Sequence, residues 1–135
     1  MNIHEKLFQA VHQNNKIDKV LELIEMGADI GAREELGRTP LHYACAYSET
    51  EIALILIEKG ADVGARDNVG RTPLHSACYN GKTKTALMLI EKGADVGVKD
   101  DEGRTPLDLA SGELKLLIKK KKFHNFINKI KKIFL

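Results

Sequence analysis

Apolar residues recur along much of the chain at spacings of three and four, which is the period of an amphipathic helix. Two such stripes open the chain and are separated by the polar residues 13–16; they are Leu7, Phe8, Ala10 and Val11, then Ile17, Val20, Leu21, Leu23 and Ile24. Two later segments, residues 52–57 and 86–90, are apolar nearly all round. We therefore expect short helices throughout, the later two sandwiched between neighbours.

One stretch of the chain is repeated. The sequence GRTPLHYAC begins at Gly37 and returns as GRTPLHSAC at Gly70. It returns again at Gly103, altered at its end, as GRTPLDLA. The two steps are equal, and a fixed period of about 33 residues is typical of a solenoid built from stacked repeats.

The repeats carry signals for where helices begin and end. A threonine N-cap followed by proline at the first helical position predicts three helix starts, at Thr39–Pro40, Thr72–Pro73 and Thr105–Pro106. The element LIE(M/K)GAD recurs with the same period, and its glycines fit left-handed turns at helix ends: Gly27, Gly60 and Gly93. Ser48 and Gly81 hold equivalent positions in the turn between the two helices of a repeat.

These residues resemble the ankyrin-repeat family, whose signature is a T-P-L-H-x-A core at a period of about 33 residues. The resemblance covers residues 4 to about 118 and implies an all-α repeat solenoid, in which hairpin-like loops join helix-turn-helix units. We place the repeats at about 1–36, 37–69, 70–102 and 103–118, with terminal units that cap the stack. They form one domain, 1–118, which precedes a basic amphipathic C-terminal helix at 119–135.

The resemblance also implies roles for single residues. The histidine of the motif ties neighbouring repeats together in this family, so His42 and His75 are expected to be structural, with Asp108 in that place in the last repeat. The asparagine that the family often carries two residues after Gly-Ala-Asp is glycine here, so we expect less rigid loops at Gly31, Gly64 and Gly97. The last repeat turns early, after Ala110, and is shortened.

Charge is distributed unevenly. Residues 113–135 hold eight lysines and one acid, a net charge of +7, whereas residues 1–112 hold 13 basic and 18 acidic residues, a net charge of −5. The sequence of this tail predicts a helix. Counted at 100° per residue, however, its two apolar stripes, 114–118 and 123–134, lie about 160° apart around the helix axis. We therefore expect a bend at Lys119–Lys122, with a separate amphipathic helix beyond it.

Four roles are open for the tail. It can fold back to cap the core, dock a protein or self-associate, lie on an anionic membrane surface, or serve nuclear import or nucleic-acid binding. We favour the cap, and lysines without arginine are a poor nucleic-acid signature. The candidate tail residues are Lys119, Lys120, Lys121, Lys122, Phe123, Phe126, Ile127, Ile130, Ile133 and Phe134.

The candidate chemistry points away from catalysis. The chain has no glycine-rich phosphate loop, nucleophile elbow or HExxH motif, so we expect no enzyme activity, no cofactor and no metal. The acidic runs Glu34-Glu35 and Asp100–Glu102 fall on loop tips, where we expect exposure and no tuning of their pKa. Cys45 and Cys78 share one repeat position, too far apart for a disulfide, and are expected to be buried thiols.

What remains is a binding surface, because stacking aligns equivalent positions of the repeats. In ankyrin-like proteins the concave face consists of loop tips and first helices, so the resemblance implies a protein partner there. By position, the loop-tip candidates are Arg33, Glu35, Leu36, Arg66, Asn68, Val69, Lys99, Asp101 and Glu102. The helix candidates are Gln13, Asn14, Ala46, Tyr47, Tyr79 and Asn80. Tyrosines are enriched at binding hot spots, so Tyr47 and Tyr79 lead this set.

The chain is expected to be a cytoplasmic monomer. Its first residues, 1–6, lack the basic-then-apolar layout of a secretion signal, and no apolar run reaches about 18 residues. The sequence therefore predicts a protein-binding module that uses its concave face. The alternative is a membrane-surface or self-associating module that uses its tail.

Overall fold

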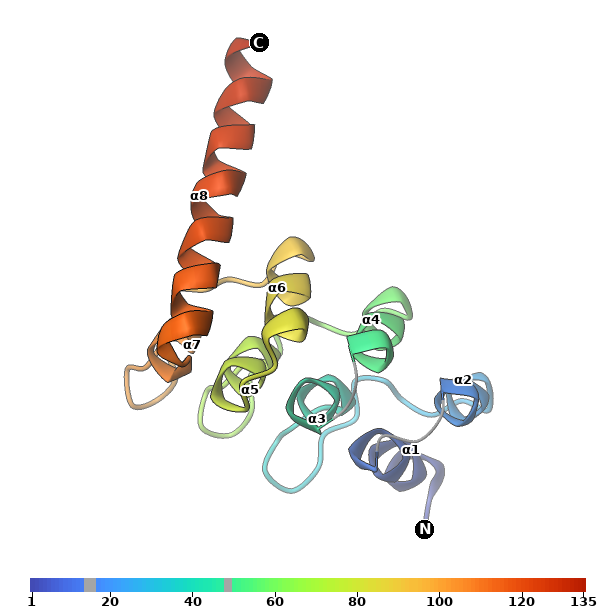
Figure 1. Ribbon diagram of the computed structural model, residues 1–135. Coiled ribbons are helices and arrows are strands. Elements are labelled where there is room, and N and C mark those ends of the chain that lie inside the picture. Colours follow the sequence, from blue (N-terminus) through green and yellow to red (C-terminus); the bar gives the residue numbers. More distant parts are fainter. Residues whose placement is uncertain (14–16, 48–49) are drawn as a thin grey trace.

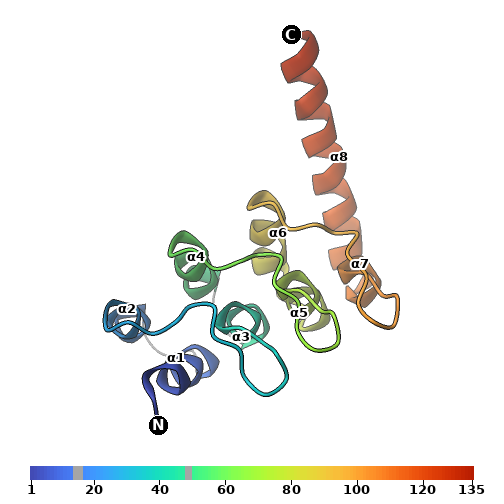
Figure 2. The same cartoon turned by 180° about the vertical axis from the view of Figure 1, so that it is seen from behind.

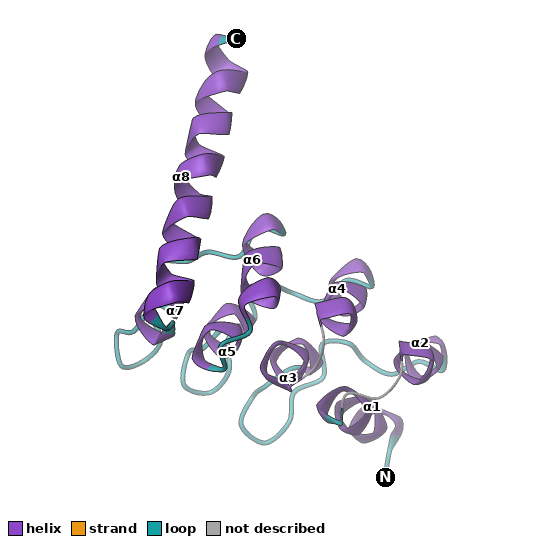
Figure 3. Cartoon of the chain, in the orientation of Figure 1, coloured by secondary structure: helices purple, strands orange, loops and turns teal. Residues whose placement is uncertain are grey.

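The computed structural model describes residues 1–13, 17–47 and 50–135, and within these ranges every regular element is a helix (Figure 3). In chain order the helices are α1 (Ile3–His12), α2 (Ile17–Glu25), α3 (Pro40–Tyr47), α4 (Thr50–Glu58), α5 (Pro73–Tyr79), α6 (Thr83–Glu91), α7 (Pro106–Leu109) and α8 (Gly112–Phe134).

The helices stack in two rows. The first row holds α1, α3, α5 and α7, and the second holds α2, α4, α6 and the start of α8, with loops projecting beside the first row (Figures 1 and 2). Each helix packs on the next member of its own row and on its partner in the same repeat. This is the expected all-α repeat solenoid.

The repeated motif sets the start of each first-row helix. Thr72 and Thr105 accept hydrogen bonds from the backbone N–H three residues on, and proline follows each at the first helical position. Thr39 Oγ1 accepts the same bond from His42 N, at 3.4 Å. Gly27, Gly60 and Gly93 end the second-row helices with φ of 98°, 104° and 96°, a conformation that glycine adopts without a Cβ clash. The expected helix boundaries are confirmed at these positions.

The core runs along the interface between the rows. Leu41 and Leu74 are fully buried, and so are Ala44 and Ala77, whose small side chains let neighbouring repeats approach closely. In α4 the sandwiching is only partial, because Ile52, Ala53 and Leu56 are buried but their neighbours on the outer side are half-buried. The second row therefore keeps one side in contact with solvent.

The loops between repeats are closed by aspartates. Asp29, Asp62 and Asp95 each accept a hydrogen bond from the backbone N–H of the glycine two residues on, at 2.9, 2.8 and 2.8 Å. These bonds order the turns that contain Gly31, Gly64 and Gly97. The aspartate thus supplies a side-chain hydrogen bond where glycine cannot.

The expected bend in the tail is wrong. α8 is one continuous helix of 23 residues through Lys119–Lys122. Leu114 and Ile118 are buried against the stack, and they complete the shortened last repeat, whose α7 has four residues. The helix is continuous because lysine is a good helix former, so the run of lysines does not interrupt it.

The tail does not fold back over the core either. Beyond Ile118 α8 projects away from the two rows (Figure 1), and Phe123, Phe126, Ile133 and Phe134 are 57–77% exposed. Lys121 reaches back from this part of the helix to form an ion pair with Glu91 of α6. The cap at this end is therefore residues 112–118 and not 123–135.

Candidate binding face

The motif histidines are part of the architecture. His42 lies buried in α3, where its Nδ1 accepts a hydrogen bond from Thr39 N, at 3.1 Å, and its Nε2 lies 2.9 Å from the carbonyl oxygen of Arg71. His75 repeats the arrangement with Thr72 N, at 3.0 Å, and the carbonyl of Arg104, at 2.9 Å. The expected structural role of both residues is confirmed.

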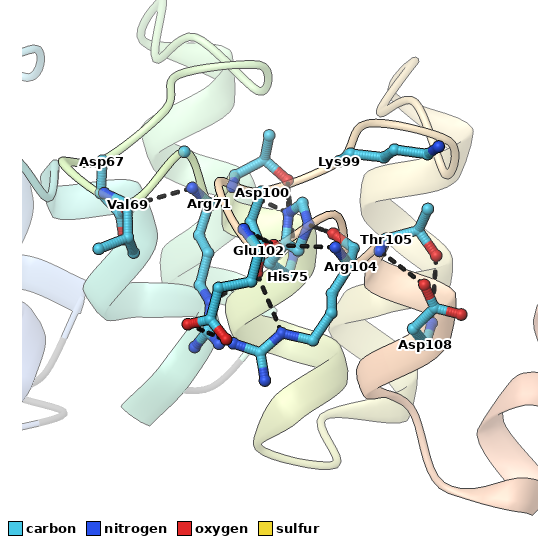
Figure 4. Close-up of polar contacts among 12 residues, drawn as sticks. Asp67, Val69, Arg71, His75, Lys99, Asp100, Glu102, Arg104, Thr105 and Asp108 are labelled. Atoms are coloured by element: carbon cyan, nitrogen blue, oxygen red, sulfur yellow. Dashed lines mark hydrogen bonds and ion pairs between the residues drawn. The ribbon is translucent and has the colours of Figure 1, made fainter.

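In Asp108 the last repeat has a shorter substitute for the histidine. Its carboxylate accepts a hydrogen bond from Thr105 N, at 2.9 Å (Figure 4), which lowers the pKa of Asp108. Asp108 therefore caps its own helix, as the histidines do, and no further copy of the motif follows it in the chain.

A carboxylate stands at one equivalent loop position in each of the first three repeats: Glu34, Asp67 and Asp100. Each accepts hydrogen bonds from the backbone N–H groups two and four residues further on, at 2.8–3.0 Å. The three carboxylates therefore close the loops from inside, and a carboxylate is well suited to this because it only accepts.

The expectation that these acidic runs are exposed and untuned is wrong for Glu34 and Asp100. Asp100 is 6% exposed, and Figure 4 shows it between Arg71, at the start of its own repeat, and Arg104, at the start of the next, with nitrogen–oxygen distances of 3.3 and 3.5 Å. Hydrogen bonding by the Arg104 N–H is the main cause that lowers the pKa of Asp100. For Glu34, burial opposes ionisation, but hydrogen bonds from Arg38 and Tyr43 outweigh it and lower the pKa.

Three of the loop-tip candidates also hold the loops together. Arg33 donates to the carbonyl oxygens of Gly37 and, in the next repeat, Arg66, at 2.9 and 2.6 Å. Arg66 repeats this with Gly70 and the Lys99 carbonyl, and Asn68 Nδ2 donates to the Glu35 carbonyl at 3.1 Å. Arg33, Arg66 and Asn68 thus bridge successive loops.

The other loop-tip candidates present their side chains to solvent. Leu36 and Val69 are exposed apolar residues, at 55% and 52%, on equivalent tips. The exposed residues Glu35, Lys99 and Asp101 bond to neighbouring loops through their backbone groups. The exposed side chain of Glu102 forms an ion pair with Arg104, at 3.1 Å. Leu36 and Val69 therefore offer the apolar part of the loop tips.

Four of the helix candidates lie around a pocket of about 180 Å³ between α3 and α5. Tyr47 and Tyr79 both line it, and they are 44% and 66% exposed. Ala46 and Asn80 also line it, and Asn80 Nδ2 donates to the Ser76 carbonyl at 2.8 Å. Gln13 is exposed at the end of α1, whereas Asn14 and the turn residue Ser48 lie outside the described residues.

Sequence reasoning missed three residues that line this pocket, Tyr43, Arg38 and Arg71. Tyr43 packs edge-on against Phe8 and His12, with ring centroids 5.4 and 5.5 Å apart, and His12 also contacts Tyr47, at 4.6 Å. The guanidinium of Arg38 lies over the Tyr43 ring at 4.7 Å, and burial raises the pKa of Tyr43. A signal was available, because the position of Tyr43 is serine in the next copy of the motif and so differs between copies.

Arg71 gives the pocket its second cation. Its guanidinium lies 5.7 Å from the centre of the Tyr79 ring, while its Nε holds Asp100. Arg38 is fixed in a similar way by Glu34 and Tyr43, at 3.1 and 2.9 Å. The pocket therefore presents tyrosine rings beside two guanidinium groups whose positions are set by buried or half-buried partners.

Other reactive groups are enclosed or dispersed. Cys45 and Cys78 are buried free thiols, and burial raises the pKa of both, that of Cys78 to about 12. In the part of the chain that the structure describes, no three His, Cys, Asp or Glu side chains converge as a metal site would require.

A comparison with family models matches residues 7–100 to ankyrin repeats, in three copies. A search of curated proteins finds no match. Ankyrin repeats are generally protein–protein interaction modules and are typically non-enzymatic. Since the match spans more than half of the chain and the helices stack with the period of the sequence motif, this chain belongs to the ankyrin-repeat family.

Proposed function

We propose that this protein is a non-enzymatic interaction module that binds a protein partner through its concave face, the face made by the loop tips and the first-row helices. The observation that carries the proposal is the pocket between α3 and α5, with Tyr47 and Tyr79 at its sides. Tyrosine and arginine are the residue types enriched at binding hot spots, and both line this pocket.

The pocket is suited to binding because its side chains are fixed before a partner arrives. Ring contacts hold Tyr43 and Tyr47, whose ring centroids lie 5.8 Å apart. Carboxylates hold Arg38 and Arg71. Less side-chain entropy is then lost on association. Leu36 and Val69 on the loop tips extend the surface with exposed apolar area.

We place the boundary of the binding domain near residue 118, because Ile118 is the last buried residue of the chain among those described. We further propose a cytoplasmic location, which suits two free and buried thiols. α8 carries a separate surface that does not take part in the concave face.

The test is affinity capture from a lysate with the wild type beside a Tyr47→Ala/Tyr79→Ala double variant. A Glu58→Ala/Lys59→Ala double variant, altered at two exposed residues at the end of α4, is the matched control. We expect a protein captured by the wild type and the control but at least tenfold depleted with the tyrosine variant. Because both tyrosines are exposed, all three proteins should share one urea midpoint. Equal capture by all three would contradict binding at this pocket.

A cross-linking experiment locates the partner independently. A photoreactive phenylalanine at position 79 should cross-link to the captured protein, and the same group at position 59 should not. A cross-link only from position 59 would assign the partner to the second-row side of the stack.

A further inference from the structure

The outward side of α8 carries an apolar arc that one exposed lysine, Lys119, interrupts between Leu116 and Phe123. Counting about 100° per residue, its members lie within about 120° of the helix circumference: Leu116, Phe123, Phe126, Ile127, Ile130, Ile133 and Phe134. Most of these side chains are exposed, from 36% for Ile130 to 77% for Phe134. Leu114 and Ile118 lie on the opposite side of the helix and are buried in the stack. Phe126, at one edge of the arc, lines a cavity with Ile90 and Val96 of the stack, and the rest of the arc points away from the repeats.

Lysines border this arc on both sides. On the same helical count, Lys120 and Lys131 lie about 20–40° beyond one edge. Lys122 and Lys129 lie about 20–40° beyond the other edge, where they are exposed at the rim of the cavity that Ile90 and Val96 also line. No acidic residue follows Glu113 in the chain. Long lysine side chains at the border of an apolar face can keep their stems on it while their ammonium groups reach outward.

We propose that the arc of α8 lies on the surface of an anionic lipid bilayer. The phenylalanine and isoleucine side chains would enter the boundary between headgroups and acyl chains, and the bordering lysines would meet lipid phosphates and carboxylates. None of the described helices is long and apolar enough to cross a bilayer. In this proposal α8 lies in the plane of the surface, as an amphipathic helix does at an interface. With the arc facing the lipid, the repeat stack is on the solvent side.

Charge decides against a second copy of the chain as the occupant. Two arcs placed face to face would bring the bordering lysines of one helix against those of the other, with no acidic residue after Glu113 on either. An anionic surface reverses the sign of that interaction, because it attracts each lysine that comes near it. The arc thus combines a lipid-facing apolar side with complementary charge.

The test uses the intact chain in a co-sedimentation assay with vesicles of phosphatidylcholine alone and of phosphatidylcholine mixed with phosphatidylserine in equal parts. We expect binding to the mixed vesicles that is at least tenfold stronger than binding to phosphatidylcholine and that weakens as salt is raised. Replacing Lys120, Lys122, Lys129 and Lys131 by glutamine should weaken binding at least tenfold. The matched control makes the same change at exposed lysines of the stack, Lys6, Lys19, Lys59 and Lys92, and should stay within about threefold of the wild type.

A Phe123→Ser/Phe134→Ser variant tests the apolar contribution. Both side chains are exposed, so the variant should keep the urea midpoint of the wild type and lose at least tenfold in binding. Three results would overturn the proposal: no sedimentation with mixed vesicles, equal loss in both lysine variants, or unchanged binding of the serine variant. A dimer in sedimentation velocity that the serine variant abolishes, without vesicle binding, would assign the arc to self-association instead.

Discussion

The Nε2 atom of His42 donates a hydrogen bond to the carbonyl oxygen of Arg71, 2.9 Å away and in the next repeat. The proton is on Nε2 because Nδ1 already accepts a bond from Thr39 N. One neutral imidazole therefore caps its own helix and holds the following loop. His75 does the same one repeat later.

Replacing His75 with leucine should destabilise the protein. The change leaves Thr72 N and the Arg104 carbonyl without their buried partner, which costs about 1–3 kcal/mol. Urea unfolding followed by circular dichroism measures the loss. His124→Ala on the exposed part of α8 is the control and should stay within about 0.5 kcal/mol of the wild type. Equal losses in the two variants would show that the inter-repeat bond contributes nothing specific.

Stability should fall as the pH is lowered from 7.5 to 5.5. Burial lowers the pKa of both His42 and His75 below the ordinary value of 6.5, so below pH 6.5 the unfolded chain takes up protons that the folded protein does not. The contribution of the two neutral histidines to the free energy of unfolding is complete above pH 6.5 and is lost as the pH falls through their pKa in the folded protein. The free energy of unfolding changes by at most about 1.4 kcal/mol per pH unit for each histidine. Urea melts at several pH values measure it.

The His75→Leu variant serves as the control for this slope, because it retains only His42 of the pair and should show a shallower dependence. A wild-type stability that stays flat from pH 7.5 to 5.5 would contradict the neutral, buried state of these rings. Below about pH 4 a further loss is expected from Glu34, Asp100 and Asp108, whose pKa values are lowered in the folded protein.

Leu74→Ala should cost about 2–5 kcal/mol, because the side chain is fully buried in α5 and its loss leaves a cavity between repeats. Leu36→Ala, which removes an apolar side chain that is 55% exposed, should change the free energy of unfolding by less than about 0.5 kcal/mol. Urea melts compare the two. A loss below about 1 kcal/mol for Leu74→Ala would be incompatible with its place in the core.

Two glycines with nearly the same backbone angle should respond differently to alanine. Gly37 and Gly103 have φ of 75° and 77°, so alanine costs about 1–2 kcal/mol at either position through the left-handed conformation alone. A Cβ on Gly37 would also lie 2.9 Å from the backbone nitrogen of Asn68, whereas nothing lies within 4 Å at Gly103.

Gly37→Ala must therefore displace the next loop and weaken the bond from Asn68 N to the Leu36 carbonyl, now 3.0 Å long. We expect it to be less stable than Gly103→Ala by a further amount of about 1–3 kcal/mol, the usual cost of overpacking. Thermal or urea unfolding of the two variants in parallel decides this, and equal stability would mean that the loops are not in close contact.

Much of the fold was predictable because the repeated motif encodes its own contacts. Threonine, proline and histidine in TPLH specify a capped helix start and the bond to the next repeat, so helix starts and inner-face residues such as Leu41 and Leu74 could be assigned from spacing alone. The tail was harder. The offset of about 160° between the two apolar stripes predicts a bend, but the helix stays straight because only the stripe at 114–118 packs on the stack.

The candidate site was predictable in outline only. The register identified Tyr47 and Tyr79, but not that Arg33 and Arg66 hold adjacent loops, since a single loop reads as exposed charge. Asp100 is paired with Arg71 at the other end of its repeat, 29 residues away in the sequence. Such contacts depend on how the loops stack, and local sequence does not report them.

Because α8 is continuous, residues 119–134 form a rigid extension of the repeat stack and not a flexible linker. A helix of 23 residues is about 35 Å long, and its first turns are locked into the last repeat. The concave face and the C-terminal end of α8 are therefore held at a fixed distance and angle, which a flexible linker would not do. Two ligands bound at the concave face and at the end of α8 would face each other in one orientation. Their effective concentration is then raised only if their shapes match that spacing.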